Sequence, residues 1–168
     1  TLKQMVEKRD PAVAGHSASL YGVFRARLAD PESYIHLSAT HGLQAIATAD
    51  PGEFLPRLVR DAFAFPSSVP AGGASKEDAA GSDLELRLRT GDVLVAVVQF
   101  LGDLAPHHAN TLLGPGLAAC AKDPEPHVRA CALTVLAELC RTANASPAVH
   151  ACRVELLEAS TAIARASG

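Results

Sequence analysis

The segment from Lys122 to Cys140 most constrains what this chain can fold into, because it starts as a helix should and then keeps one apolar face. Asp123 is a favourable N-cap residue, and Pro124 falls at the first helical position, where its missing N–H costs no hydrogen bond. Apolar residues then recur with the period of an α-helix, at Val128, Cys131, Ala132, Val135, Leu136 and Leu139. The segment therefore predicts an amphipathic helix with a marked start.

The same pattern recurs twice elsewhere in the chain, which indicates a repeat protein. Residues 30–46 align with residues 123–139 without a gap, and this copy again starts with Asp-Pro-Glu. Residues 92–104 align with residues 127–139 and place Val93, Val97, Leu101 and Leu104 at the apolar positions. Related amphipathic helices with other helices between them predict helical hairpins that stack into an all-α solenoid.

Taken in order, the chain predicts about seven helices, which make three hairpins and a half. The expected segments are 11–28, 31–48, 50–63, 84–104, 107–121, 122–140 and 147–166. Residues 66–82 are rich in Gly, Ser and Pro and lack apolar periodicity, so we expect a flexible insertion within the second hairpin. Residues 1–168 then form a single array, and we expect a fragment of a longer protein, because the last helix lacks an inner partner.

Composition argues against several classes of function. The formal net charge is −3, so nothing favours a nucleic-acid partner. No apolar run reaches the roughly 18 residues that a membrane span needs, so we expect no membrane insertion by this segment. The four cysteines are 11, 9 and 12 residues apart, without a Cys-x-x-Cys motif. We therefore expect reduced, buried cysteines in an intracellular protein, with a zinc site or a disulfide as the alternatives.

The motifs in this chain do not predict an enzyme. None of the seven histidines is followed by glutamate, as in the His-Glu pairs of helical-repeat hydroxylases. His36 and His41 are five residues apart, so they do not share a helix face as a metal-binding pair would. The sequence has no phosphate-binding loop and no nucleophile elbow. We expect no catalytic residue, no metal and no cofactor.

The candidate site is the concave surface, which is usually lined by the second helix of each stacked hairpin. The exposed positions there form a mildly acidic track of Tyr34, His41, Asp92, Gln99, Asp103, His127, Thr134, Glu138 and Arg141. Asp103 and Glu138 occupy equivalent positions in the aligned copies, so stacking is expected to place them side by side. Two functions fit such a track: a scaffold that binds other proteins, or a structural spacer within a larger solenoid.

The spacing of Pro115, Asp123 and Arg129 resembles the HEAT repeat pattern. In that family the proline bends the first helix, and the aspartate and arginine form a ladder between neighbouring repeats. The resemblance therefore implies an inter-repeat ladder that involves Asp123 and Arg129. The other copies depart from the pattern, with His36 and Leu94 at the arginine position.

Four segments also resemble one particular family: residues 28–39, 54–58, 101–105 and 129–140. They are similar to the C-terminal HEAT region of the transport and Golgi organisation protein 6 homologues. That region is shared with a fungal factor for assembly and nuclear import of RNA polymerase II. The resemblance implies a non-enzymatic intracellular scaffold that binds other proteins in protein secretion and Golgi organisation. The alternative it implies is a role in assembly or nuclear import of the polymerase, with a location in the cytoplasm, at the Golgi or shuttling to the nucleus.

Overall fold

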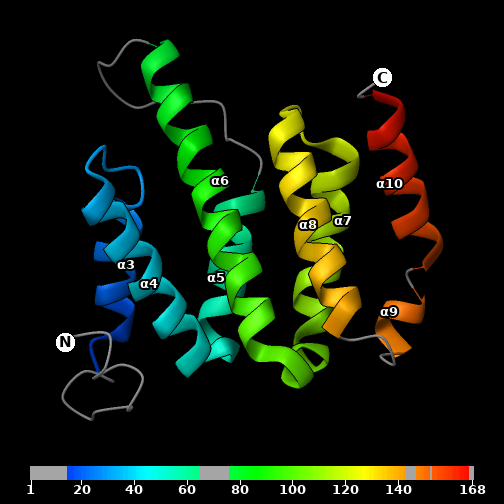
Figure 1. Cartoon of the computed structure of the whole chain (residues 1–168), viewed down its shortest axis with the longest axis horizontal. Helices are drawn as coiled ribbons and strands as arrows, with labels where there is room; N and C mark the ends of the chain where they lie inside the picture. Colours follow the sequence, from blue (N-terminus) through cyan, green and yellow to red (C-terminus); the bar gives the residue numbers. More distant parts are fainter. Residues whose placement is uncertain (1–14, 65–75, 143–146, 152, 167–168) are drawn as a thin grey trace.

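The computed structural model describes residues 15–64, 76–142, 147–151 and 153–166, and every regular element within these ranges is a helix (Figure 1). The helices are α3 (Ser17–Arg27), α4 (Ser33–Ala49), α5 (Pro51–Phe63), α6 (Lys76–Leu101), the 3-10 helix η1 (Gly102–His108), α7 (Ala109–Lys122), α8 (Pro126–Thr142), α9 (Pro147–Ala151) and α10 (Arg153–Ala166). The predicted all-α class is confirmed.

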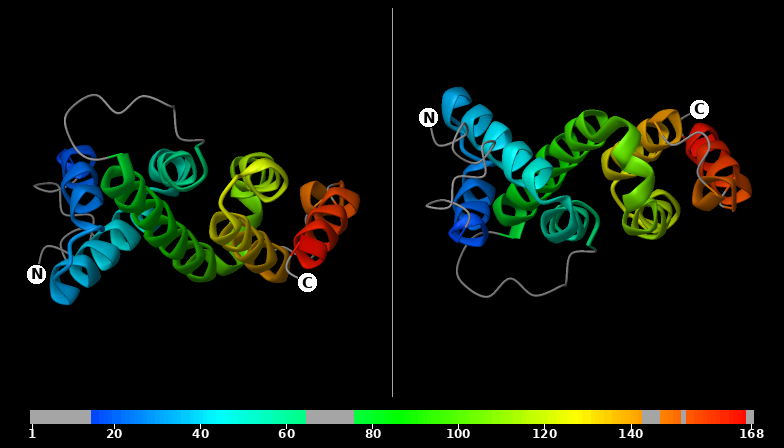
Figure 2. Two further views of the ribbon diagram at one scale, coloured as in Figure 1. Left: turned by 90° about the horizontal axis from the view of Figure 1, so that it is seen from above. Right: turned by 90° about the horizontal axis from the view of Figure 1, so that it is seen from below.

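Consecutive helices pair into hairpins, and the hairpins stack beside one another. α3 packs on α4, α5 on α6, and α7 on α8. The second helices α4, α6 and α8 contact one another in that order and form what we call the inner layer (Figures 1 and 2). The first helices form the outer layer, in which α5 packs on α7 and α10 continues the row by packing mainly on α7. This two-layer stack is the architecture of a HEAT-type α-solenoid.

Two of the predicted helix starts lie a few residues later than expected. α4 begins at Ser33 and α8 at Pro126, rather than at the prolines that follow Asp30 and Asp123. Each aspartate instead uses its Oδ1 atom to accept a hydrogen bond of 3.0 Å from the N–H two residues on, at Glu32 or Glu125. This is the geometry of an Asx-turn, which competes with helix and so delays its first turn.

α5 has the start that the sequence predicts. The Asp50 side chain accepts a hydrogen bond of 3.2 Å from the N–H of Glu53, and Pro51 is the first helical residue. An N-cap of this kind satisfies a donor that the helix itself leaves unpaired. The cap therefore fixes where α5 begins and which of its residues face the core.

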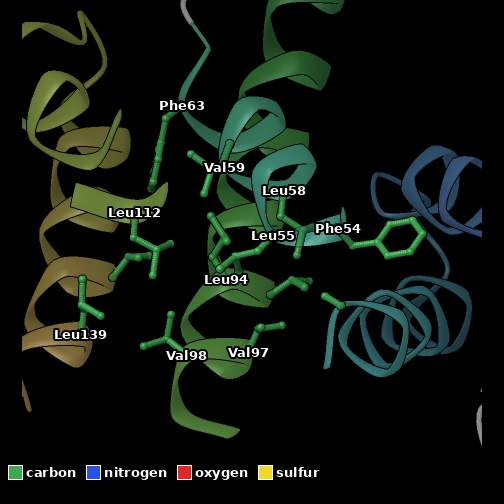
Figure 3. Close-up of a cluster of buried hydrophobic side chains, with 14 of the residues drawn as sticks. Phe54, Leu55, Leu58, Val59, Phe63, Leu94, Val97, Val98, Leu112 and Leu139 are labelled. Carbon is green, nitrogen blue, oxygen red and sulfur yellow. The ribbon is translucent and has the colours of Figure 1, made fainter. Parts of the chain in front are cut away.

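The hydrophobic core lies between the two layers and runs through all three hairpins. Its centre contains residues of α5, α6, α7 and α8, among them Phe54, Leu55, Leu58, Leu94, Val97, Leu112 and Leu139 (Figure 3). Five of the six predicted apolar positions of α8 are buried, and the sixth, Cys131, is half-buried. Because each hairpin buries its apolar face against its neighbours, the core is continuous along the stack.

α6 is longer at its N-terminus than the sequence indicated. It begins at Lys76, so residues 76–82, which were expected to belong to the flexible insertion, are helical. The run Lys-Glu-Asp-Ala-Ala explains the difference, because lysine, glutamate and alanine favour helix and acidic residues suit a helix N-terminus. The remainder of the expected insertion, residues 66–75, lies outside the described residues.

The other end of α6 also departs from the prediction. Gly102 has a φ of +49°, a left-handed conformation that ends the α-helix and directs the chain into η1. Val93, Val97 and Leu101 are buried as predicted, but Leu104 lies beyond this turn and is 59% exposed. The apolar stripe predicted for residues 92–104 therefore ends at Leu101, three residues before the predicted end at Leu104.

Candidate protein-binding surface

The predicted track lies on the solvent-exposed faces of the inner layer and η1. Its members are Tyr34 and His41 on α4, Asp92 and Gln99 on α6, Asp103 on η1, and His127, Thr134, Glu138 and Arg141 on α8. All are exposed except Glu138, which is half-buried. We call this set the inner-layer track. It crosses three consecutive hairpins, which is the geometry that a long partner segment requires.

Large exposed apolar side chains also occur close to members of the track in the sequence. Tyr34 is 82% exposed, and Leu37 lies one turn further along the same face of α4, also exposed. Phe100 is 69% exposed next to Gln99 at the end of α6. Sequence reasoning missed Leu37 and Phe100, because apolar residues near a predicted stripe are normally assigned to the core.

Contacts between α6 and α8 show which track residues are neighbours. The Gln99 side chain acts on the Glu138 carboxylate and helps to lower its pKa, and the charge of Asp92 acts on Cys131, so facing residues are 39 apart. The repeat alignment had indicated 35, which differs by about one helical turn. Asp103 lies past Gly102 in η1, whereas Glu138 is within α8, so the two carboxylates do not occupy equivalent helical positions. Glu138 faces Gln99 instead.

A glycine makes the close approach of α6 and α8 possible. A Cβ atom added at Gly91 would lie 2.1 Å from Sγ of Cys131, which is far inside van der Waals contact. α6 and α8 therefore meet at a point where only glycine fits, and this contact contributes to the observed register.

The carboxylates of the track differ in their surroundings. Arg141 donates a hydrogen bond of 2.9 Å to Glu138 Oε2 and, with Gln99, lowers the pKa of Glu138. Asp92 has its pKa raised by burial, and it makes no ion pair with any residue that the structure describes. Asp103 is exposed and also has no ion pair within the described ranges. The acidic character of the track therefore comes from Asp92 and Asp103 rather than from Glu138.

The predicted inter-repeat ladder contains a different arginine. The buried carboxylate of Asp123 pairs with Arg87 of α6, whose Nε also donates a hydrogen bond of 3.2 Å to the carbonyl of Ala62 in α5. Arg129 donates to the backbone carbonyls of Asp123 and Pro124, at 2.8 and 3.1 Å, and so stays within its own hairpin. The link between neighbouring hairpins is therefore Arg87 to Asp123, because α6 reaches the start of α8 with its N-terminal half.

A second arginine of α6 connects to the preceding hairpin. Arg89 donates hydrogen bonds to the carbonyls of Leu28 and Asp30, the latter at 3.3 Å. Residues two apart on a helix point in nearly opposite directions, so Arg87 and Arg89 reach the hairpins on either side of α6. The signal for this arrangement was present in the sequence Leu-Glu-Leu-Arg-Leu-Arg, where two arginines interrupt an apolar run at residues 84–89.

The thiols in the described part of the chain are reduced and buried or half-buried. Cys120, Cys131 and Cys140 are free, and Cys152 lies outside the described residues. Burial raises the pKa of both Cys120 and Cys131 to about 11. Their thiols are therefore protonated at neutral pH and are weak nucleophiles and metal ligands. Across the described ranges, no group of His, Cys, Asp and Glu side chains is arranged to hold a metal ion.

Within the described ranges, no helix is both long enough and apolar enough to cross a membrane.

The stacked hairpins, with helix-interior prolines in α5 and α7 and a buried aspartate at the start of α8, define a HEAT-type helical-repeat protein. A HEAT repeat model matches residues 113–143, which cover most of α7 and all of α8. A second family model, described as required for nuclear transport of RNA pol II, C-terminus 1, matches residues 1–104. The chain belongs to this family. No solved structure matches the chain significantly.

These matches separate the two roles that the sequence resemblance implied. The family description refers to nuclear transport of RNA polymerase II, which is the role expected as the alternative. Neither description mentions secretion or the Golgi, so that assignment stays a prediction. The match to residues 1–104 includes α3, α4, α5 and α6.

Proposed function

We propose that this chain is a non-enzymatic scaffold that binds a protein partner along the inner-layer track, in the nuclear transport of RNA polymerase II. The observation that carries the proposal is the track itself, which crosses three consecutive hairpins and presents the exposed ring of Tyr34 and the carboxylates of Asp92 and Asp103, which have no ion pair within the described ranges. The family description supplies the process. Such a scaffold would operate in the cytoplasm and the nucleus.

The composition of the track favours binding over a purely structural role. A spacer needs only small or solvated side chains on its free surface, whereas Tyr34 and Phe100 are large and largely exposed. Aromatic side chains are enriched among the residues that dominate binding energy at protein interfaces. Asp92 is partly desolvated without a cation beside it, so a basic side chain of a partner would relieve that cost. These features support a partner segment that combines basic and apolar residues.

Direct binding to purified RNA polymerase II tests the proposal. The full 168-residue chain is immobilised, and polymerase binding is measured by biolayer interferometry at low and at physiological salt. The variant Asp92→Lys/Asp103→Lys reverses the two unpaired charges, and Glu155→Lys/Glu158→Lys makes the same charge change on exposed positions of α10. We expect the first variant to weaken binding about tenfold at low salt and less at high salt, because charge contacts are screened.

The control separates a local effect from a change in net charge. Equal weakening by the α10 variant would mean that only total charge matters. Binding that is unchanged in the folded Asp92→Lys/Asp103→Lys variant would overturn the assignment to the track. Tyr34→Ala provides a second, uncharged test, and we expect it to shorten the residence time of the complex without altering its salt dependence.

A further inference from the structure

The outer layer contains a groove between α5 and α7, on the other side of the stack from the inner-layer track. Its volume is about 310 Å³, and its walls are apolar side chains of Pro56, Val59, Phe63 and Pro115. Figure 3 shows Val59 and Phe63 on the side of α5 that faces α7. A volume of this size is at the lower end of the range for ligand pockets, so it suits one or two side chains of a peptide.

Arg60 lies at this groove and makes few interactions with the rest of the described chain. Its side chain is exposed. Its one ion pair within the described ranges is with the adjacent Asp61, with 3.6 Å between Arg60 Nε and Asp61 Oδ1. Asp61 is already engaged, because the Tyr21 hydroxyl donates to it at 2.9 Å and Arg25 Nε lies 2.7 Å from it, an ion pair without hydrogen-bond geometry. The Arg60 guanidinium is therefore available to an anionic group from outside.

Thr111 supplies a further unused polar group, its hydroxyl. Five other helical threonines, at positions 40, 48, 90, 134 and 161, donate their hydroxyl to the carbonyl four residues back. The Thr111 hydroxyl has no hydrogen-bond partner among the described residues, although it lines the groove. An apolar groove thus has an unused hydroxyl donor and a cation at its edge.

We infer that this groove binds an extended acidic segment of a protein partner. An apolar side chain of the segment fills the space between the two prolines, and a backbone carbonyl of the segment accepts a hydrogen bond from the Thr111 hydroxyl. A carboxylate one or two residues along pairs with Arg60. Charge complementarity selects this occupant, because the polar side chains at the groove are one cation and one hydroxyl donor, which fit a carboxylate and a peptide carbonyl. The inference is independent of the inner-layer track, whose proposed partner segment is basic.

A synthetic peptide tests the inference directly. The probe is fluorescein-labelled Ser-Gly-Asp-Leu-Phe-Asp-Glu-Gly-Ser, and its binding to the full chain is followed by fluorescence anisotropy at two salt concentrations. We expect saturable binding that Arg60→Gln weakens about tenfold and Thr111→Val about threefold. Ala64→Leu, which fills the groove from an exposed position at the end of α5, should weaken binding at least as much as Arg60→Gln.

Matched controls decide the outcome. Arg27→Gln removes an exposed arginine of α3 and should leave the affinity within about twofold. A probe with lysines in place of its acidic residues should not bind the groove. The inference is overturned if the reversed probe binds equally well, if Arg60→Gln and Ala64→Leu have no effect, or if no binding is seen. It is also overturned if the acidic probe binds only after residues 66–75 are replaced by a Gly-Ser link, because the groove would then belong to the chain's own segment.

Discussion

Removing one partner of the ion pair between Arg87 and Asp123 is expected to destabilise the protein far more than removing both. The Arg87 side chain is 5% exposed and that of Asp123 0%, so either charge alone would remain buried without a counter-ion. Breaking such a pair costs about 3–5 kcal/mol of unfolding free energy, whereas replacing both charges is often nearly neutral. Asp123→Asn keeps the oxygen that accepts from the N–H of Glu125, and Arg87→Met keeps most of the apolar stem.

The expected size of each change follows from the contacts. Each single variant should lose about 3 kcal/mol or more, which for a chain of this size lowers the melting temperature by roughly 10 °C. The double variant Arg87→Met/Asp123→Asn should lose only about 1 kcal/mol, for the hydrogen bond from Arg87 to the Ala62 carbonyl. The two single effects are therefore expected to be strongly non-additive.

Urea titration followed by circular dichroism measures the four unfolding free energies of this double-mutant cycle. The exposed pair of Arg57 and Glu53, at 2.7 Å, is the control, and its cycle should give a coupling below about 1 kcal/mol. Additive losses at Arg87 and Asp123, or single losses as small as those of the exposed pair, would refute the reasoning. The two hairpins would then be held together by apolar packing alone.

Three further predictions concern the packing of α8. Leu136→Ala should cost about 2–5 kcal/mol in a denaturant titration, because Leu136 is fully buried and its loss leaves a cavity. Gly91→Ala should cost about 1–3 kcal/mol, because the new Cβ collides with Sγ of Cys131, and adding Cys131→Ala should restore most of the loss. Iodoacetamide should modify Cys120 and Cys131 slowly at pH 8, below their pKa of about 11, and faster as the pH approaches that value, which mass spectrometry can follow. Rapid modification of the folded protein at pH 8 would show that the two thiols are not desolvated.

The fold was predictable because its determinants are local and repeat along the chain. The apolar stripe of α8 could be identified from its period alone, and the related stripes in α4 and α6 indicated stacking. The helix starts were less predictable, because Asp30 and Asp123 each make an Asx-turn while Asp50 caps its helix, from nearly the same sequence. Asp123 is also held by an arginine from another hairpin, a contact that its local sequence does not contain.

The candidate surface was predictable residue by residue but not as a set of neighbours. Exposure follows from the helical period, so Tyr34, Gln99 and Thr134 lie where the pattern placed them. Which residues face each other across two helices depends on the stagger between hairpins. The close contact at Gly91 contributes to that stagger, and alignment of the repeats does not contain it. For this reason the expected partner of Glu138 was wrong by about one helical turn, and Gln99 is found instead.

The two arginines of α6 have a consequence for cooperativity. In a solenoid each hairpin contacts only its neighbours, so the array can in principle lose its end units one at a time. Here the hairpin of α5 and α6 contacts both of its neighbours through arginines. Arg89 donates to the Leu28 carbonyl at the end of α3, and Arg87 donates to the Asp123 carboxylate just before α8. Fraying of either end therefore breaks polar contacts as well as apolar ones, because Arg87 loses the Asp123 carboxylate and Arg89 loses its two carbonyl partners while keeping only Glu85 of its own helix. The three hairpins that contain α3 to α8 should consequently behave as one unit, with partly opened forms too rare to populate.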